Sequence, residues 1–156
     1  MHLSTESVAR RGRPWVITDT IVLMAIKFHP EQGSILVCDF KGLQEPEITK
    51  RRPVLVISPK LKNRGRLCTV VPFSTTPPRP VEAYHCRLLM DPRLPSPYDN
   101  EWQWVKADLV YTVAFDRLSL MQVGKDAAGK RIYDQRVVPA EILQQVQHCL
   151  RCGLGL

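Results

Sequence analysis

The sequence lacks the long apolar stretch that a membrane-spanning helix needs. No run approaches the roughly 18 consecutive apolar residues of a span. The basic opening segment is followed by "VITDTIVLMAI", which Thr18, Asp19 and Thr20 interrupt, so it does not form the apolar core of a signal peptide. These absences predict a protein that has no membrane segment and works in the cytoplasm.

Cysteine and histidine are present in patterns that predict neither a disulfide framework nor a metal site. The five cysteines are an odd number without regular spacing, so we expect free thiols in a reducing compartment. Cys149 and Cys152 form one CxxC beside His148, but the sequence has no second CxxC. Clustered carboxylates, as in a two-metal nuclease, are also missing. We therefore expect no metal and no cofactor.

The composition that remains is that of a basic globular protein. A chain of 156 residues with 44% hydrophobic content most simply forms one domain with a real core. Thirteen prolines against eight glycines favour strands and stiff loops over long helices. The formal net charge of +7 makes a polyanion such as nucleic acid a suitable partner.

Short apolar stretches bounded by turn residues predict a mainly β fold with one helix. Strands are expected within residues 34–40, 53–58, 67–73, 84–90, 102–113 and 131–138. A helix is expected over residues 139–153, with Pro139 in its first turn and Gly153 as its cap. Five or six strands and a terminal helix predict a small, strongly bent antiparallel sheet or barrel. Residues 1–27 are expected to be an N-terminal extension, either disordered or an added edge strand, ahead of a domain over residues 28–156.

Three bases stand at the entrance of the second expected strand. Lys50, Arg51 and Arg52 precede Pro53, and Glu47 lies five residues before Arg52. The proline biases Arg52 towards extended backbone, and a planar guanidinium is well suited to phosphate. Glu47 could orient that guanidinium or act as a base. The alternative is a solvated loop whose ion pair contributes less than about 1 kcal/mol.

Hydroxyl and indole side chains follow other expected strands. Ser74 and Thr75 come directly before a proline pair, where fixed hydroxyls could donate to phosphate oxygens and Arg79 would add charge. The same residues also suit an ordinary turn. Trp102 and Trp104 share one face of the expected strand over 102–113, so they could stack on nucleobases or pack in the core.

Four segments together resemble the PemK/MazF family of type II toxin–antitoxin toxins. They are "GSILVCDFKG", "EPEITKRRPVLVISP", "CTVVPFSTT" and "ADLVYTVAFDRL", within roughly residues 33–120. The resemblance implies an SH3-like antiparallel barrel with a C-terminal helix, usually a homodimer. It also implies an endoribonuclease that cleaves single-stranded RNA at short sequences without metal and is silenced by a cognate antitoxin.

The resemblance also implies roles for individual residues. The family's catalytic arginine before proline and hydroxyl at the end of the third strand correspond to Arg52 and Ser74, with Thr75 as an adjacent candidate, and Glu47 matches the loop acid. Cleavage through the ribose 2′-OH needs a proton acceptor, a proton donor and charge stabilisation of the phosphoryl group. We expect Arg52 to supply the charge and Ser74 to hold the phosphate in line. Whether Glu47 is the base or orients Arg52 stays open.

The chain also departs from the family pattern. Pro46 stands where some members have a histidine, and Tyr111 and Ala114 stand where some have an arginine and an aspartate; Asp108 and Tyr111 are candidate substitutes. A second hypothesis is therefore a barrel that binds nucleic acid or antitoxin with weakened chemistry. A third is a DNA-binding co-repressor of its own operon, acting with the antitoxin. The residues expected to contact nucleic acid are Lys50, Arg51, Arg64, Arg79, Trp102, Asp108 and Tyr111.

Overall fold

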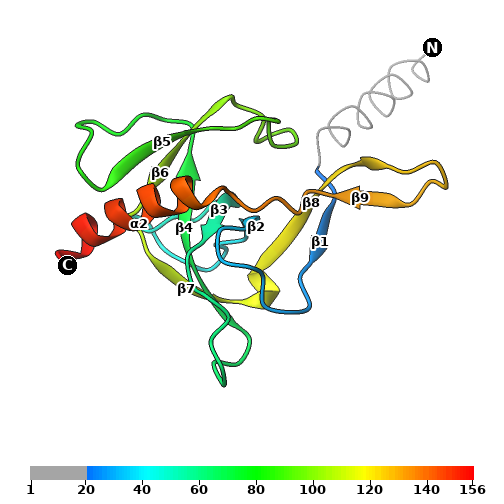
Figure 1. The fold of residues 1–156 in the computed structure, drawn as a ribbon, viewed down its shortest axis with the longest axis horizontal. Coiled ribbons are helices and arrows are strands. Elements are labelled where there is room, and N and C mark those ends of the chain that lie inside the picture. Colours follow the sequence, from blue (N-terminus) through cyan, green and yellow to red (C-terminus); the bar gives the residue numbers. More distant parts are fainter. Residues whose placement is uncertain (1–20) are drawn as a thin grey trace, which may run out of the picture.

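The computed structural model describes residues 21–156 of the chain. This part contains nine strands, a 3-10 helix η1 and an α-helix α2 (Figure 1). The strands are β1 (Leu23–Ala25), β2 (Ile35–Cys38), β3 (Arg52–Val56), β4 (Leu67–Ser74), β5 (His85–Leu89), β6 (Trp102–Lys106), β7 (Tyr111–Ala114), β8 (Leu118–Lys125) and β9 (Arg131–Tyr133). The helices are η1 (Phe115–Arg117) and α2 (Ala140–Leu154).

One antiparallel sheet organises the described residues. Its strand order is β1-β8-β2-β3-β4-β6-β5, while β7 also pairs with β4 and β9 with β8. The ends of this path, β1 and β5, do not pair with each other, so the bent sheet stays open. In Figure 1, α2 lies across the β4–β6 side and the β8–β9 hairpin projects from the opposite side. The predicted fold class, a mainly β protein with a small SH3-like antiparallel barrel and a C-terminal helix, is confirmed, although the sheet is bent without closing.

The central strands bury side chains on both faces of the sheet. Along β2, Ile35 and Val37 join one apolar cluster, which also contains Val146 and Cys149 of α2. The alternate residue Leu36 joins a second cluster on the other face, under η1 and β7. Because both faces are covered, these strands read as continuous apolar runs rather than as an alternating pattern. Each fully buried aliphatic side chain contributes about 1.5–3 kcal/mol.

The predicted single strand over residues 102–113 is wrong. The chain forms two strands here, and both pair with β4: Phe73 lies opposite Val105 and Val70 opposite Tyr111. Val105 and Tyr111 are six residues apart, whereas their partners on β4 are only three residues apart. The extra residues between β6 and β7 form a turn that starts with the buried Ala107. No glycine or proline marks this turn, so the local pattern did not reveal it.

The structure also adds a long strand that the apolar pattern did not predict. β8 pairs with β1, β2 and β9, so it joins the N-terminal strand and the C-terminal hairpin to the centre of the sheet. Within the expected N-terminal extension, β1 aligns Leu23 with Met121 of β8. Residues 1–20 lie outside the described residues, and the division of the chain at residue 27 stays a prediction.

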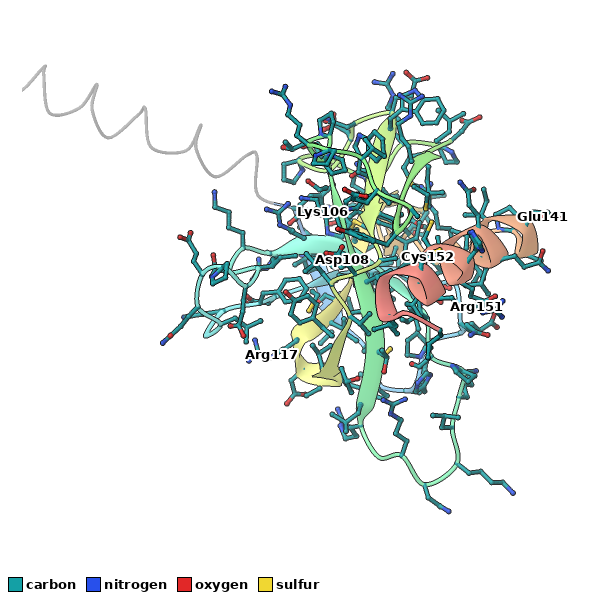
Figure 2. All side chains as sticks on the ribbon, turned by 90° about the vertical axis from the view of Figure 1, so that its left-hand side faces the viewer. Lys106, Asp108, Arg117, Glu141, Arg151 and Cys152 are labelled. Atoms are coloured by element: carbon teal, nitrogen blue, oxygen red, sulfur yellow. The ribbon has the colours of Figure 1, made fainter. Side chains whose placement is uncertain are left out.

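The C-terminal helix begins where expected and ends later than expected. Pro139 is its N-cap, whereas Gly155, with φ of 71°, closes the last turn in place of Gly153. Gly153 instead lies inside the helix, where an added Cβ would come within 3.1 Å of Asp108 Cα and Tyr84 Cβ. The last turns of α2 thus pack closely on the turn after β6, as Cys152 and Asp108 in Figure 2 illustrate. No helix of residues 21–156 is both long and apolar enough to cross a membrane.

Candidate functional site

Adjacent strands bring Arg52 and Ser74 together. β3 and β4 are antiparallel with Val54 opposite Pro72, and continuing that register by two residues places Arg52 opposite Ser74. Directly opposed residues of an antiparallel pair project from the same face with Cα atoms about 5 Å apart. The first residue of one strand and the last residue of its neighbour therefore meet at one edge of the barrel.

Two connected cavities open at this edge. The larger has a volume of about 660 Å³ and the smaller about 210 Å³, and Lys50, Arg52 and Ser74 line both. The larger cavity is also lined by Glu45, Pro46, Glu47, Ile48, Thr49, Pro72, Phe73, Lys106 and Leu109. The smaller is also lined by Arg51, Pro53, Phe73, Thr75, Pro97, Tyr98 and Gln103. Arg52 and Ser74 thus lie where the two cavities join.

Arg52 carries a polar group that its surroundings leave unsatisfied. Its Nε atom is buried and has no hydrogen-bond partner among the described residues. A buried donor without a partner costs about 1–3 kcal/mol, and folded proteins rarely tolerate one without a reason. Arg52 as a whole is partly exposed, so an anion in the cavity would accept from the terminal N–H groups of its guanidinium fork rather than from the buried Nε.

Ser74 is held by a short turn at the end of β4. Its side chain is buried, and its Oγ accepts a hydrogen bond from the backbone N–H of Thr76 at 3.2 Å. The hydroxyl proton has only a long contact of 3.5 Å, to the Thr76 carbonyl oxygen. Because a hydroxyl rotates about its C–O bond, Ser74 can redirect this proton to an acceptor in the cavity. The hydroxyl-rich segment therefore forms both a turn and one wall of the candidate site.

Two hydrogen bonds hold the loop that carries Glu47, one at Glu47 itself and one at the next residue. The Glu47 carboxylate accepts from the backbone N–H of Gln44 at 2.8 Å. The next residue, Ile48, donates its backbone N–H to the Tyr111 hydroxyl at 3.4 Å, and the Tyr111 ring packs 5.0 Å from that of Phe40. Tyr111, expected to contact nucleic acid, is partly buried against the second apolar cluster and supports the loop from there. Glu47 lines the larger cavity with a carboxylate already engaged by the backbone.

Arg51 lines the smaller cavity and forms a surface ion pair. Its guanidinium lies 3.3 Å from Asp39 Oδ2, and both side chains remain about half exposed. The pKa of Asp39 is lowered mainly by the backbone N–H of Lys41, with a further contribution from Arg51. Exposure and salt make such a pair weak, so Arg51 can exchange Asp39 for an incoming anion at little cost.

The sequence did not identify Lys106, Tyr98 or Gln103 as lining residues. Lys106 lines the larger cavity, while Tyr98 and Gln103 line the smaller one. The buried Gln103 amide donates to the Tyr98 carbonyl at 3.1 Å, and burial raises the pKa of the Tyr98 hydroxyl. The sequence did contain a signal for Gln103, because a polar residue stands there between two tryptophans. Figure 2 places Lys106 near the middle of the molecule, above Asp108.

Other expected site residues lie elsewhere. Arg64 donates to the hydroxyls of Thr69 and Thr112, towards the end of β4 that is opposite to Ser74. Asp108 pairs with His85 at 3.8 Å, and neither Asp108 nor Arg79 is among the residues that line the two cavities. Trp102 lines a third cavity, described below. Within residues 21–156, no group of three or more His, Cys, Asp or Glu side chains is placed to hold a metal ion.

Comparisons with known proteins identify the family. A sequence profile described as PemK-like, MazF-like toxin of type II toxin-antitoxin system matches residues 31–152. The chain is 30% identical over 149 residues to the uncharacterized protein YifN of Escherichia coli (strain K12), covering 81% of this chain and 93% of YifN. The chain therefore belongs to the PemK-like, MazF-like toxin family, as its sequence motifs predicted.

Solved structures share the fold at low sequence identity. MazF from Deinococcus radiodurans matches with a TM-score of 0.55 at 21% identity, covering 83% of this chain and 100% of that chain. An endoribonuclease in complex with its cognate antitoxin, from a mycobacterial species, matches with a TM-score of 0.53 at 21% identity, covering 82% and 97%. At this identity, the likeness establishes the common architecture.

Proposed function

We propose that this protein is the toxin of a type II toxin–antitoxin module and a metal-independent endoribonuclease acting on single-stranded RNA in the cytoplasm. Family membership supports the class, and one local observation supports the chemistry. Arg52 stands opposite Ser74, and the two adjoining cavities share Lys50, Arg52 and Ser74 in their linings. This is an arrangement that can receive a phosphate and hold it between a permanent charge and a hydroxyl.

The proposed reaction is an in-line transfer at the phosphate. The ribose 2′-oxygen forms a bond to phosphorus as the bond from phosphorus to the 5′-oxygen breaks. A base takes the 2′-OH proton, and the leaving 5′-oxygen takes a proton from solvent water. Arg52 stabilises the charge on the non-bridging oxygens, and Ser74 donates to one of them and fixes the geometry. Glu47 lines the same cavity and is our candidate for accepting the proton, because the Gln44 N–H engages only one of its two carboxylate oxygens.

The decisive experiment is cleavage of a long RNA by the purified protein in EDTA. We expect cleavage by the wild type and a loss of at least about 100-fold in rate for Arg52→Ala, the scale of removing one transition-state donor. Ser74→Ala should lose less than Arg52→Ala, because Thr75 lies beside it. Arg64→Ala is the matched control, since it removes the same charge at the other end of β4. No cleavage by the wild type, or equal rates for Arg52→Ala and Arg64→Ala, would contradict the proposal.

We further propose a cognate antitoxin as the physiological partner and a homodimer as the active form. The mycobacterial endoribonuclease with the same architecture was solved bound to its own antitoxin. Induced expression of this chain should arrest growth, and expression of a small protein encoded beside it should relieve the arrest. Growth arrest that Arg52→Ala leaves unchanged would separate toxicity from the proposed cleavage.

A binding module with weakened chemistry remains the second candidate. Two observations favour it: the Glu47 carboxylate is engaged by the backbone, and Tyr111 supports a loop instead of offering a charged group to the cavity. This candidate expects salt-sensitive RNA binding without products. The EDTA experiment with wild-type protein distinguishes the two.

A further inference from the structure

A stripe of large side chains runs along the outer face of β6. Trp102, Trp104 and Lys106 alternate with Gln103 and Val105, and the latter two are buried. Strand geometry therefore sends the two indoles and the lysine to the same face, away from the core. Lys106 lines the cavity that contains Arg52, so this face begins at the proposed phosphate site.

Cross-strand pairing extends the row that starts at Arg52. Ser74 lies opposite Trp104 of β6, and Trp104 lies opposite Arg87 of β5. The neighbouring row, Phe73 opposite Val105, packs in the first apolar cluster, so the row through Ser74 projects from the other face of the sheet, where Ser74 is buried, Trp104 is partly exposed and Arg87 is exposed. Neighbouring strands are about 4.8 Å apart. Trp104 is thus the next side chain along the face from Ser74.

The two tryptophans line a third cavity, the aromatic cavity. It has a volume of about 530 Å³ and is lined by Thr75, Pro77, Arg87, Arg93, Asp99, Asn100, Glu101, Trp102 and Trp104. Thr75 also lines the smaller cavity, which contains Arg52 and Ser74. The aromatic cavity therefore adjoins the proposed phosphate site across a single residue.

The smaller cavity and the aromatic cavity differ in the charge of the residues that line them. The smaller cavity is lined by Lys50, Arg51 and Arg52, with no acidic residue in its lining. In the aromatic cavity, two arginines are matched by two acids, Asp99 and Glu101. A phosphate is favoured in the first and gains little in the second. An uncharged planar group is suited to the second, because its walls are indoles with acceptor oxygens at the rim.

One of the two indoles, that of Trp102, is held in place before any ligand arrives. The guanidinium carbon of Arg87 lies 4.1 Å from the centroid of the Trp102 ring, a cation–π contact. Trp102 is 40% exposed, an unusual degree for so large an apolar side chain, and Trp104 is partly exposed beside it. Aromatic faces that are fixed and open to solvent stack on bases with little loss of conformational freedom.

We propose that the aromatic cavity binds an unpaired nucleobase of the RNA, on the face of Trp104, next to the phosphate held by Arg52 and Ser74. Trp102, clamped by Arg87, forms the far wall. The inference rests on the proposed function for the position of the phosphate. It adds a contact that selects single strands, because a base in a duplex is already stacked and paired and cannot enter.

Binding of two oligomers by the full chain tests the base subsite separately from cleavage. One is a fluorescently labelled, fully 2′-O-methylated RNA of about 12 nucleotides, within the length that single-strand sites cover. It has no 2′-OH to attack. The other has the same length and backbone with every base removed. Trp104→Ala should weaken binding of the first by about 5- to 100-fold, the range for one stacked base, and leave the second unchanged.

Further variants keep the result interpretable. Trp104→Phe retains an aromatic face and should restore most of the affinity, so a loss in Trp104→Ala that comes from misfolding would be recognised. Phe28→Ala removes an aromatic side chain, 78% exposed, from another surface and should change neither affinity. Arg52→Ala should weaken both oligomers, because it acts on the backbone.

The outcomes separate this inference from the proposed function. Equal losses on the two oligomers, no loss on either, or failure of Trp104→Phe to recover affinity would overturn the base subsite. Absence of binding to both oligomers by the wild type would also overturn it. Failure of the wild type to cleave RNA in EDTA, with base-dependent binding intact, would overturn the nuclease and leave the subsite standing.

Discussion

Replacing Arg52 with methionine should make the protein more stable and less active. The methionine retains an unbranched apolar stem of similar reach, so packing against neighbouring side chains is largely kept. It removes a buried Nε that has no hydrogen-bond partner among the described residues. Stability and activity are thus predicted to move in opposite directions, as is common where a site is held ready for a ligand.

The expected gain in stability follows from removing the Nε atom of Arg52. A buried, unsatisfied donor costs about 1–3 kcal/mol. Arg52 is only partly buried, which relieves the rest of the guanidinium, so we take the lower end, about 1 kcal/mol of added stability. For a chain of this length, the melting temperature should rise by about 2–4 °C. The cleavage rate should fall by at least about 100-fold, or about 2.7 kcal/mol of transition-state stabilisation.

Thermal unfolding and RNA cleavage in EDTA measure the two effects. Arg51→Met is the matched control, because the adjacent arginine is more exposed and its guanidinium is paired with Asp39 at 3.3 Å. That variant should lose less than about 1 kcal/mol of stability. If Arg52→Met is instead clearly less stable than wild type, the arginine supports the fold, and our reading of its unsatisfied nitrogen is refuted.

Three further predictions concern parts of the fold that hold the site. A thiol reagent at pH 8 should label Cys152 quickly and the other four cysteines only after denaturation, because Cys152 alone is exposed; fast labelling of two or more thiols in the native protein would refute this. Gly153→Ala should lower the free energy of unfolding by about 1–3 kcal/mol in denaturant titration, because its Cβ would collide with the turn after β6. Gly124→Ala, with open space around the added Cβ, should change it by less than about 0.5 kcal/mol. The folded-state pKa of Asp39 is lowered by a backbone N–H and by Arg51, so its contribution to stability is present above its unfolded pKa and lost as pH falls through the folded pKa. Asp39→Asn should therefore show a smaller drop in melting temperature between pH 7 and pH 3 than wild type, and an equal drop would count against that account.

The sequence was informative wherever a signal was local. Arg52 before a proline and Ser74 at the end of an apolar strand could be identified because each is defined by its neighbours in the chain. The turn that separates β6 from β7 could not, since its cause is the pairing of both strands with β4. The support that Tyr111 gives to the Glu47 loop could not be identified for a similar reason: its hydroxyl accepts from a residue 63 positions away in the sequence.

Residue type and short-range spacing were enough to predict the central apolar strands, the terminal helix, the basic balance and the family motifs. The tertiary structure decided which of the basic and hydroxyl residues share a cavity. It left Arg64 at the far end of β4 and brought in Lys106, Tyr98 and Gln103. The physical reason is that strand register and sheet bending are set by long-range pairing and by burial of both faces of the sheet, which no short stretch of sequence encodes alone.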